Sequence, residues 1–100
     1  MAKESLIPEQ FELLNHTINV EHHDALPKAV GDDIACHGCA EYGANEIRLY
    51  GDTGSVLDHT FYHELTHFML HYSGRDDLSE DETFVDVFGG LLAQYMKTKR

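Results

Sequence analysis

Basic residues are scarce in this sequence, and their scarcity narrows the possible partners. Seven Lys and Arg residues stand against 18 Asp and Glu residues, which gives a formal net charge of −11. Because a surface of this sign repels phosphate groups, we expect no nucleic-acid partner. The three basic residues at the C-terminus suit the end of a helix, whose dipole attracts positive charge; they are Lys97, Lys99 and Arg100.

Segments that direct or anchor a chain are also lacking. No apolar run approaches the roughly 18 residues needed to cross a bilayer. The first ten residues, MAKESLIPEQ, lack the apolar core of a signal peptide. We therefore expect a cytoplasmic protein without a membrane partner.

Cysteines and linker-like segments are equally few. The two cysteines, Cys36 and Cys39, lie too close along the chain to cross-link distant parts of a fold. No internal repeat or Pro/Gly/Ser-rich tract divides the 100 residues, and this length suits one domain with one core. The sequence thus predicts a single domain over residues 1–100.

The first half of the chain predicts one helix and three strands. Apolar residues at helical spacing favour an amphipathic helix over residues 6–14. Apolar and polar residues then alternate over residues 17–23, as in a half-buried strand. Two β-compatible runs, residues 34–42 and 46–50, flank a short Gly-Ala-Asn turn, so we expect them to pair as a hairpin.

The second half predicts two helices. Between Ser55 and the Ser73-Gly74 stop, apolar residues recur at helical spacing; they are Leu57, Phe61, Leu65, Phe68 and Tyr72. A last helix is expected from about Glu80 to Lys97, with an apolar stripe of Phe84, Val87, Phe88, Leu91 and Tyr95. The predicted class is α+β in the order αβββαα, with a three-stranded sheet packed on the last two helices.

The first of these two helices carries an HExxH motif. The motif reads His63-Glu64-Leu65-Thr66-His67. Residues four apart are neighbours on a helix, so His63 and His67 can bind one metal ion, while Glu64 can reach a water on that ion. The motif predicts a Zn²⁺ site with Glu64 as the catalytic general base.

A catalytic zinc normally takes three protein ligands and leaves one position for water. Glu82 is the candidate third ligand. It shares a helix face with Asp86 and with two small residues, Gly89 and Ala93. The two small residues let another helix approach closely. Asp86 is expected to accept the second ring N–H of a ligating histidine. The alternative for Glu82 is a capping box in which it bonds the backbone amide of Ser79.

Other possible ligands suit the site less well. His71 lies about 12 Å along the helix axis from His63 and cannot share its ion. Acidic residues ahead of a helix are typical of a favourable helix start, and these are Asp76, Asp77 and Asp81. A separate, closed structural zinc site could use Cys36 and Cys39 with two histidines, His22 and His23.

Two segments in the last half of the chain resemble those of a known enzyme family. HELTHFMLH followed by ETFVDVFGGLL resembles the minimal gluzincins of the ImmA/IrrE type, and the Glu-x-x-x-Asp pair of Glu82 and Asp86 is similar to that of thermolysin-like enzymes. The resemblance implies a zincin-like fold, Glu82 as the third zinc ligand and a peptide or protein substrate. It also implies an edge strand that pairs with the substrate, for which residues 46–50 are expected.

These features predict hydrolysis of a peptide bond by a zinc-bound water that Glu64 deprotonates. A second group that polarises the carbonyl is expected among three residues, His59, Tyr62 and Tyr72. Two alternatives stay open. One is a zinc-stabilised protein-binding module without catalytic activity, and the other is a metal-free protein in which the same side chains form a polar network.

Overall fold

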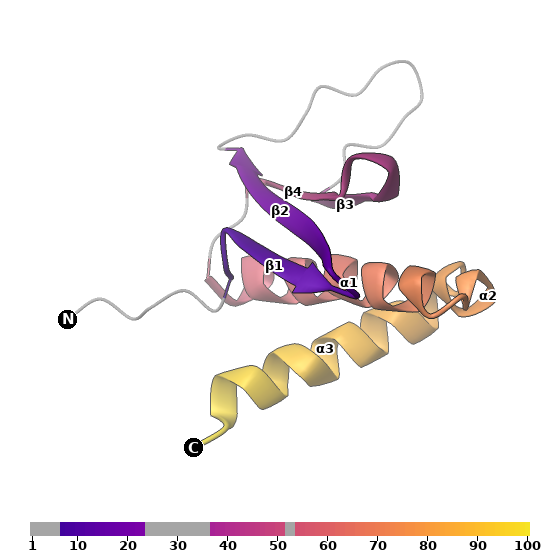
Figure 1. Cartoon of the computed structure of the whole chain (residues 1–100). Coiled ribbons are helices and arrows are strands. Elements are labelled where there is room, and N and C mark those ends of the chain that lie inside the picture. The colour runs from indigo at the N-terminus through magenta and orange to yellow at the C-terminus, as the bar shows by residue number, and fades with distance from the viewer. Residues whose placement is uncertain (1–6, 24–36, 52–53) are drawn as a thin grey trace, which may run out of the picture.

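The computed structural model describes residues 7–23, 37–51 and 54–100, and these form an α+β arrangement (Figure 1). Four strands build one mixed sheet: β1 (Gln10–Leu13), β2 (His16–His23), β3 (Gly38–Glu41) and β4 (Glu46–Tyr50). The other elements are the 3₁₀ turn η1 (Tyr42–Ala44) and the helices α1 (Gly54–Tyr72), α2 (Asp76–Ser79) and α3 (Glu82–Thr98). In this part of the chain, no helix is both long and apolar enough to span a membrane.

The strands lie in the order β1-β2-β4-β3. β1 and β2 are antiparallel, β2 and β4 are parallel, and β3 and β4 are antiparallel. Ile47 of β4 lies between Val20 of β2 and Ala40 of β3. β4 is therefore central, which makes the expectation that residues 46–50 form the edge strand wrong. β1 and β3 are the edges of the described sheet.

Helix α1 is the middle layer, with the sheet on one side and α3 on the other (Figure 1). Its predicted apolar stripe is confirmed, because Phe61, Leu65 and Phe68 are buried. They pack with Ile18 and Ile47 of the sheet in one hydrophobic cluster. This core fixes α1 along the sheet and leaves its opposite face to α3.

The predicted strand over residues 17–23 and the predicted hairpin are confirmed by β2, β3 and β4, although residues 34–36 lie outside the described part. The predicted N-terminal helix is wrong, since its described residues contain β1. Leu14 and Asn15 both adopt positive φ angles, of 48° and 68°. This conformation makes a tight turn between two antiparallel strands, so β1 pairs with β2.

The last helix begins at Glu82, two residues later than predicted, and the short helix α2 precedes it unpredicted. The apolar stripe predicted to be the buried face of the last helix, α3, is wrong, because Val87, Leu91 and Tyr95 are 58%, 65% and 62% exposed. The buried positions are Val85 and Gly89. A Cβ added to Gly89 would lie only 2.9 Å from the Cα atom of His63, so the two helices approach through small residues.

Candidate metal centre

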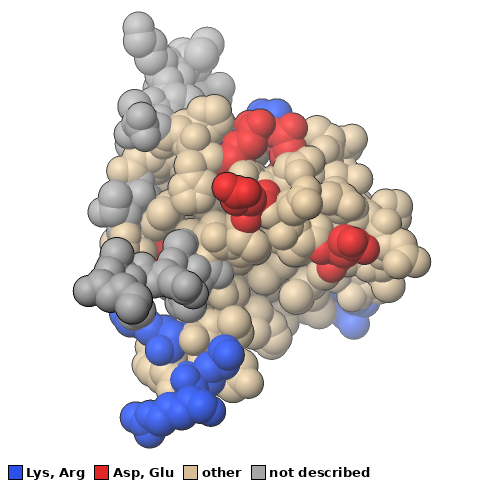
Figure 2. Space-filling view, turned by 60° about the vertical axis from the view of Figure 1, so that its left-hand side comes forward, with Lys and Arg blue, Asp and Glu red and all other residues tan. Residues whose placement is uncertain are grey.

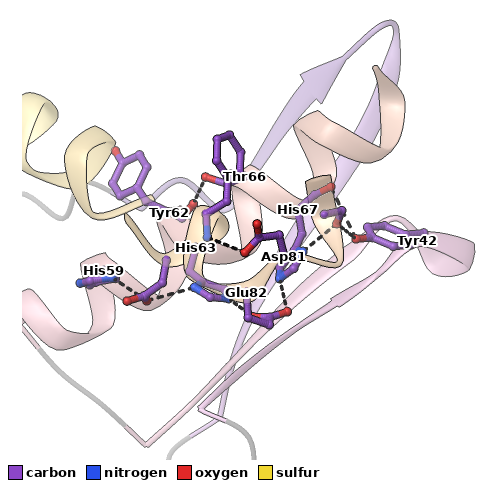
Figure 3. Close-up of polar contacts among 11 residues, drawn as sticks. Tyr42, His59, Tyr62, His63, Thr66, His67, Asp81 and Glu82 are labelled. Carbon is purple, nitrogen blue, oxygen red and sulfur yellow. Dashed lines mark hydrogen bonds and ion pairs between the residues drawn. The ribbon is translucent and has the colours of Figure 1, made fainter. Parts of the chain in front are cut away.

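Two histidines of α1 and one glutamate of α3 converge on one point. His63 and His67 point toward Glu82 in the first turn of α3 (Figure 3). The Nε2 atom of His63 lies 3.1 Å from Oε2 of Glu82, and Nε2 of His67 lies 3.3 Å from Oε1. One ligand atom from each residue lies within 4.8 Å of the other two. The structure thus brings together the three side chains that the sequence singles out as ligands.

This set of donors fits zinc. Two imidazole nitrogens and one carboxylate oxygen are the protein ligands of one class of catalytic zinc site, which keeps a fourth position open. The imidazoles of His63 and His67 are 18% and 12% exposed, whereas the Glu82 side chain is 68% exposed. An ion held here would therefore have protein on one side and solvent on the other.

His67 is held in place from behind by Ser79 of α2. The Nδ1 atom of His67 lies 2.8 Å from the Ser79 hydroxyl oxygen, which is 3.2 Å from the Tyr42 hydroxyl. Ser79 is buried. When the Nδ1–H is donated to Ser79, the lone pair stays on Nε2, the nitrogen that faces Glu82. Burial lowers the pKa of His67, which favours the neutral imidazole that a metal requires.

Asp86 lies behind His63. Its Oδ1 atom is 3.3 Å from Nδ1 of His63 and 3.1 Å from Nε2 of His59. One carboxylate oxygen thus contacts two imidazoles of α1, one of which belongs to the cluster of ligands. This is the placement that the helical spacing of Glu82 and Asp86 predicts.

The capping alternative for Glu82 does not match the geometry. Asp81 is the N-cap of α3, and its side chain accepts a hydrogen bond from the backbone N–H of Phe84 at 3.1 Å. Ser79 bonds to His67 instead of capping. The carboxylate of Glu82 is therefore directed at the two histidines.

Glu64 lies beside this cluster in a buried position. It is 8% exposed, and burial raises its pKa to about 7, with a further increase from Glu82 and an opposing effect of His63. Gly38 of β3 makes room for it, because an added Cβ would lie 3.2 Å from Cγ of Glu64 and 2.6 Å from Cγ2 of Thr60. A carboxyl that titrates near neutrality can both take and return a proton.

A hollow of about 200 Å³ connects Glu64 with the cluster. Its lining includes His59, His63 and Asp86 from the two helices and Gly38 from β3. Glu64 therefore lies on the wall of a space that also borders one proposed ligand, His63. The hollow is open to solvent.

The three residues expected to polarise a carbonyl lie in different places. His59 lines the same hollow as Glu64. Tyr62 is buried in the core, where burial raises its pKa. The Tyr72 hydroxyl donates to Oδ1 of Asn45 and its ring stacks on His16. Of the three, His59 is the one beside Glu64.

The other acidic residues and the histidine that could have been metal ligands make different contacts. His71 stacks on Tyr42, with ring centroids 4.1 Å apart, and its Nδ1 atom lies 3.1 Å from Asp76. Asp77 pairs with Arg75 at 2.8 Å. These contacts account for the side chains without a metal.

The alternative zinc site at the cysteines depends on Cys36, which lies outside the described residues. Cys39 is half-buried on β3, and its thiol donates to Oε1 of Glu41 at 3.0 Å. Burial and the Glu41 carboxylate raise the pKa of this thiol to about 12. A metal would need the thiolate, which this surrounding disfavours.

Ser79 is the residue of the site that sequence reasoning missed, because it appeared there as a possible helix cap. No local pattern marks it, since its partner His67 lies in another helix.

Comparison with models of protein families, with curated proteins and with solved structures gives no match for this chain.

Proposed function

We propose that this chain is a zinc metallopeptidase of the gluzincin type with a small zincin-like fold. The observation that carries the proposal is the convergence of ligand atoms from His63, His67 and Glu82 within 4.8 Å, beside the buried carboxyl of Glu64. Zinc bound by these three residues supplies a Lewis acid for the substrate carbonyl and acidifies water. Proton transfer and hydrogen bonding to the substrate are assigned to side chains of this protein.

Glu64 is assigned as the general base that takes a proton from the attacking water and returns it to the leaving amine. Without metal the pKa of Glu64 is about 7, and bound zinc would lower this value and favour the carboxylate, the form that takes the proton near neutral pH. His59, on the same hollow, is assigned to donate a hydrogen bond from Nδ1 to the carbonyl oxygen as negative charge develops on it. Asp86 accepts from Nε2–H of His59 and from Nδ1–H of His63 and keeps both rings oriented.

The substrate assigned to this site is an extended peptide. β3 forms an edge of the described sheet, and its first residue, Gly38, lies against Glu64. A peptide that pairs with this edge would pass the hollow at Glu64 with its backbone aligned. The edge strand in this proposal is β3, in place of the strand expected from the sequence.

Metal content and hydrolysis test the proposal together. Wild type, Glu64→Gln and Glu82→Ala are purified without added metal and examined by mass spectrometry for zinc and by a peptide-library digest for cleavage. We expect one zinc per chain in wild type and Glu64→Gln, and loss of zinc in Glu82→Ala. We expect cleavage in wild type to fall by roughly 10²- to 10⁴-fold in Glu64→Gln. Glu80→Gln, an exposed neighbour, is the matched control and should behave as wild type.

The result can also reject the proposal in part or completely. Zinc in wild type without hydrolysis that depends on Glu64 would reject the peptidase and leave the zinc-stabilised binding module. Wild type without zinc would reject the metal centre itself, and the polar contacts of His63, His67 and Glu82 would then be the network of a metal-free protein.

A further inference from the structure

The outer face of α3 carries a row of large apolar side chains, which we call the α3 stripe: Phe84, Val87, Phe88, Leu91 and Tyr95. Phe84 is half-buried and the other four are exposed. The rings of Phe84 and Phe88 stack with centroids 5.8 Å apart. α3 is the outermost layer of the molecule, and its opposite face packs on α1 (Figure 1). Contiguous apolar patches of this kind are typical of interaction surfaces.

The spacing within the α3 stripe suits another helix. Phe84, Phe88, Leu91 and Tyr95 follow one another at intervals of four, three and four residues. These intervals are the alternating a and d positions of a heptad, the pattern by which two helices interlock their side chains. The side chains on the opposite face of α3 do not share this role, since they pack on α1 through Val85 and Gly89.

The distribution of charge along α3 favours a second copy of α3 in the antiparallel orientation. Glu80 and Asp81, immediately before α3, are acidic, whereas Lys97 in its last turn and Lys99 and Arg100 just after it are basic. Figure 2 shows Lys and Arg side chains gathered at the lower end of the molecule, where Figure 1 places the C-terminal end of α3. A second α3 lying antiparallel would set each acidic start against a basic end, and a parallel one would oppose like charges.

We propose that the α3 stripe joins two copies of this chain through an antiparallel α3–α3 contact. When Phe88 faces Leu91 of the second copy, Phe84 faces Tyr95, and Glu80, just before α3, comes near Lys99, just after α3. The contact is the same on both copies, as a two-fold interface requires. Long-range repulsion between chains of net charge −11 opposes association, so the apolar contact must supply the attraction. This inference does not rest on the proposed peptidase activity.

Sedimentation velocity of the full chain up to roughly 0.2 mM tests the contact. We expect a concentration-dependent dimer in wild type and a monomer for Leu91→Gln, which removes an apolar side chain without changing charge. Met69→Gln is the matched control, because Met69 is an exposed apolar residue of α1 outside the α3 stripe, and it should dimerise as wild type. Circular dichroism confirms that each variant is folded. A monomeric wild type, or a dimer that survives Leu91→Gln, would overturn the proposal and leave the surface to a different partner.

Charge reversal tests the antiparallel arrangement separately. Glu80→Lys and Lys99→Glu should each weaken the dimer, since each opposes like charges at both ends of the contact. Both changes in one chain should restore the dimer, and mixing the two single variants should give a heterodimer. Failure of the double variant to recover, with both single variants weakened, would overturn the antiparallel pairing.

Discussion

Individual side chains at this site depend on partners from other elements, and Ser79 is the clearest example. Its hydroxyl contacts Nδ1 of His67 at 2.8 Å while it remains buried on α2. The HExxH motif predicts the residues that would face the ion, because their spacing on one helix is sufficient for that. It cannot predict Ser79, because nothing in the sequence indicates how α2 turns back toward α1.

We expect Ser79→Ala to lower zinc affinity by roughly 10- to 100-fold, since removal of a partner that orients a ligating histidine typically has this effect. Competition with a chelator of known affinity measures the change. Ser73→Ala is the control, because the Ser73 hydroxyl bonds only to the backbone oxygen of Met69 among the described contacts. Equal affinity of both variants and wild type would show that Ser79 does not position His67.

The thiol of Cys39 permits a test by chemical reactivity. Its pKa of about 12 lies above the ordinary value, so the thiolate is disfavoured until the pH rises well above 9. In Cys36→Ser protein at pH 8, we expect Cys39 to react with a disulfide reagent roughly 10³-fold more slowly than free cysteine, from the thiolate fraction alone. Unfolding in urea should abolish the difference. A fast reaction in the folded protein would contradict the described surroundings of Cys39.

Among the elements, β2, α1 and the β3–β4 hairpin could be predicted from periodicity and turn residues. The segment before β2 could not, because its apolar residues fit a helix as well as a strand, and the turn at Leu14 and Asn15 decides the outcome. For α3 the spacing of apolar residues predicts the wrong buried face. Close contact of helix backbones at Gly89 fixes the buried face more strongly than side-chain hydrophobicity does.

The contact at Gly89 predicts opposite behaviour of two adjacent glycines. Gly89→Ala should lower the free energy of unfolding by about 1–3 kcal/mol, because the added Cβ meets the backbone of His63 at 2.9 Å. Gly90→Ala meets only the His59 ring, at 3.3 Å, and the gain in helix propensity is up to about 1 kcal/mol. Its stability should therefore be unchanged or higher. Urea denaturation measures the free energy of unfolding of both variants. Equal decreases in the two variants would argue against close packing of the helices at Gly89.

For the whole molecule, we expect bound zinc to link α1 to α3 and so to raise the free energy of unfolding. A ligand that binds only the folded state raises stability by RT ln(1 + [L]/Kd), or about 2.7 kcal/mol at a hundredfold excess over Kd. Addition of zinc to metal-free protein should raise the Tm of wild type and of Glu80→Gln, and a chelator should reverse the rise. Glu82→Ala should show little response. A similar rise in Glu82→Ala would mean that the ion binds elsewhere.

The three proposed ligands all lie between residues 63 and 82, in a segment that contains only helices and short connections. Closure of a loop of this length carries a small entropic cost compared with bringing distant strands together. The parallel pairing of β2 with β4, in contrast, requires an intervening crossover. A full-length chain that refolds in the presence of zinc can therefore assemble the helical half around the ion before its sheet is complete, so that metal supply would influence the order of folding as well as the stability of the product.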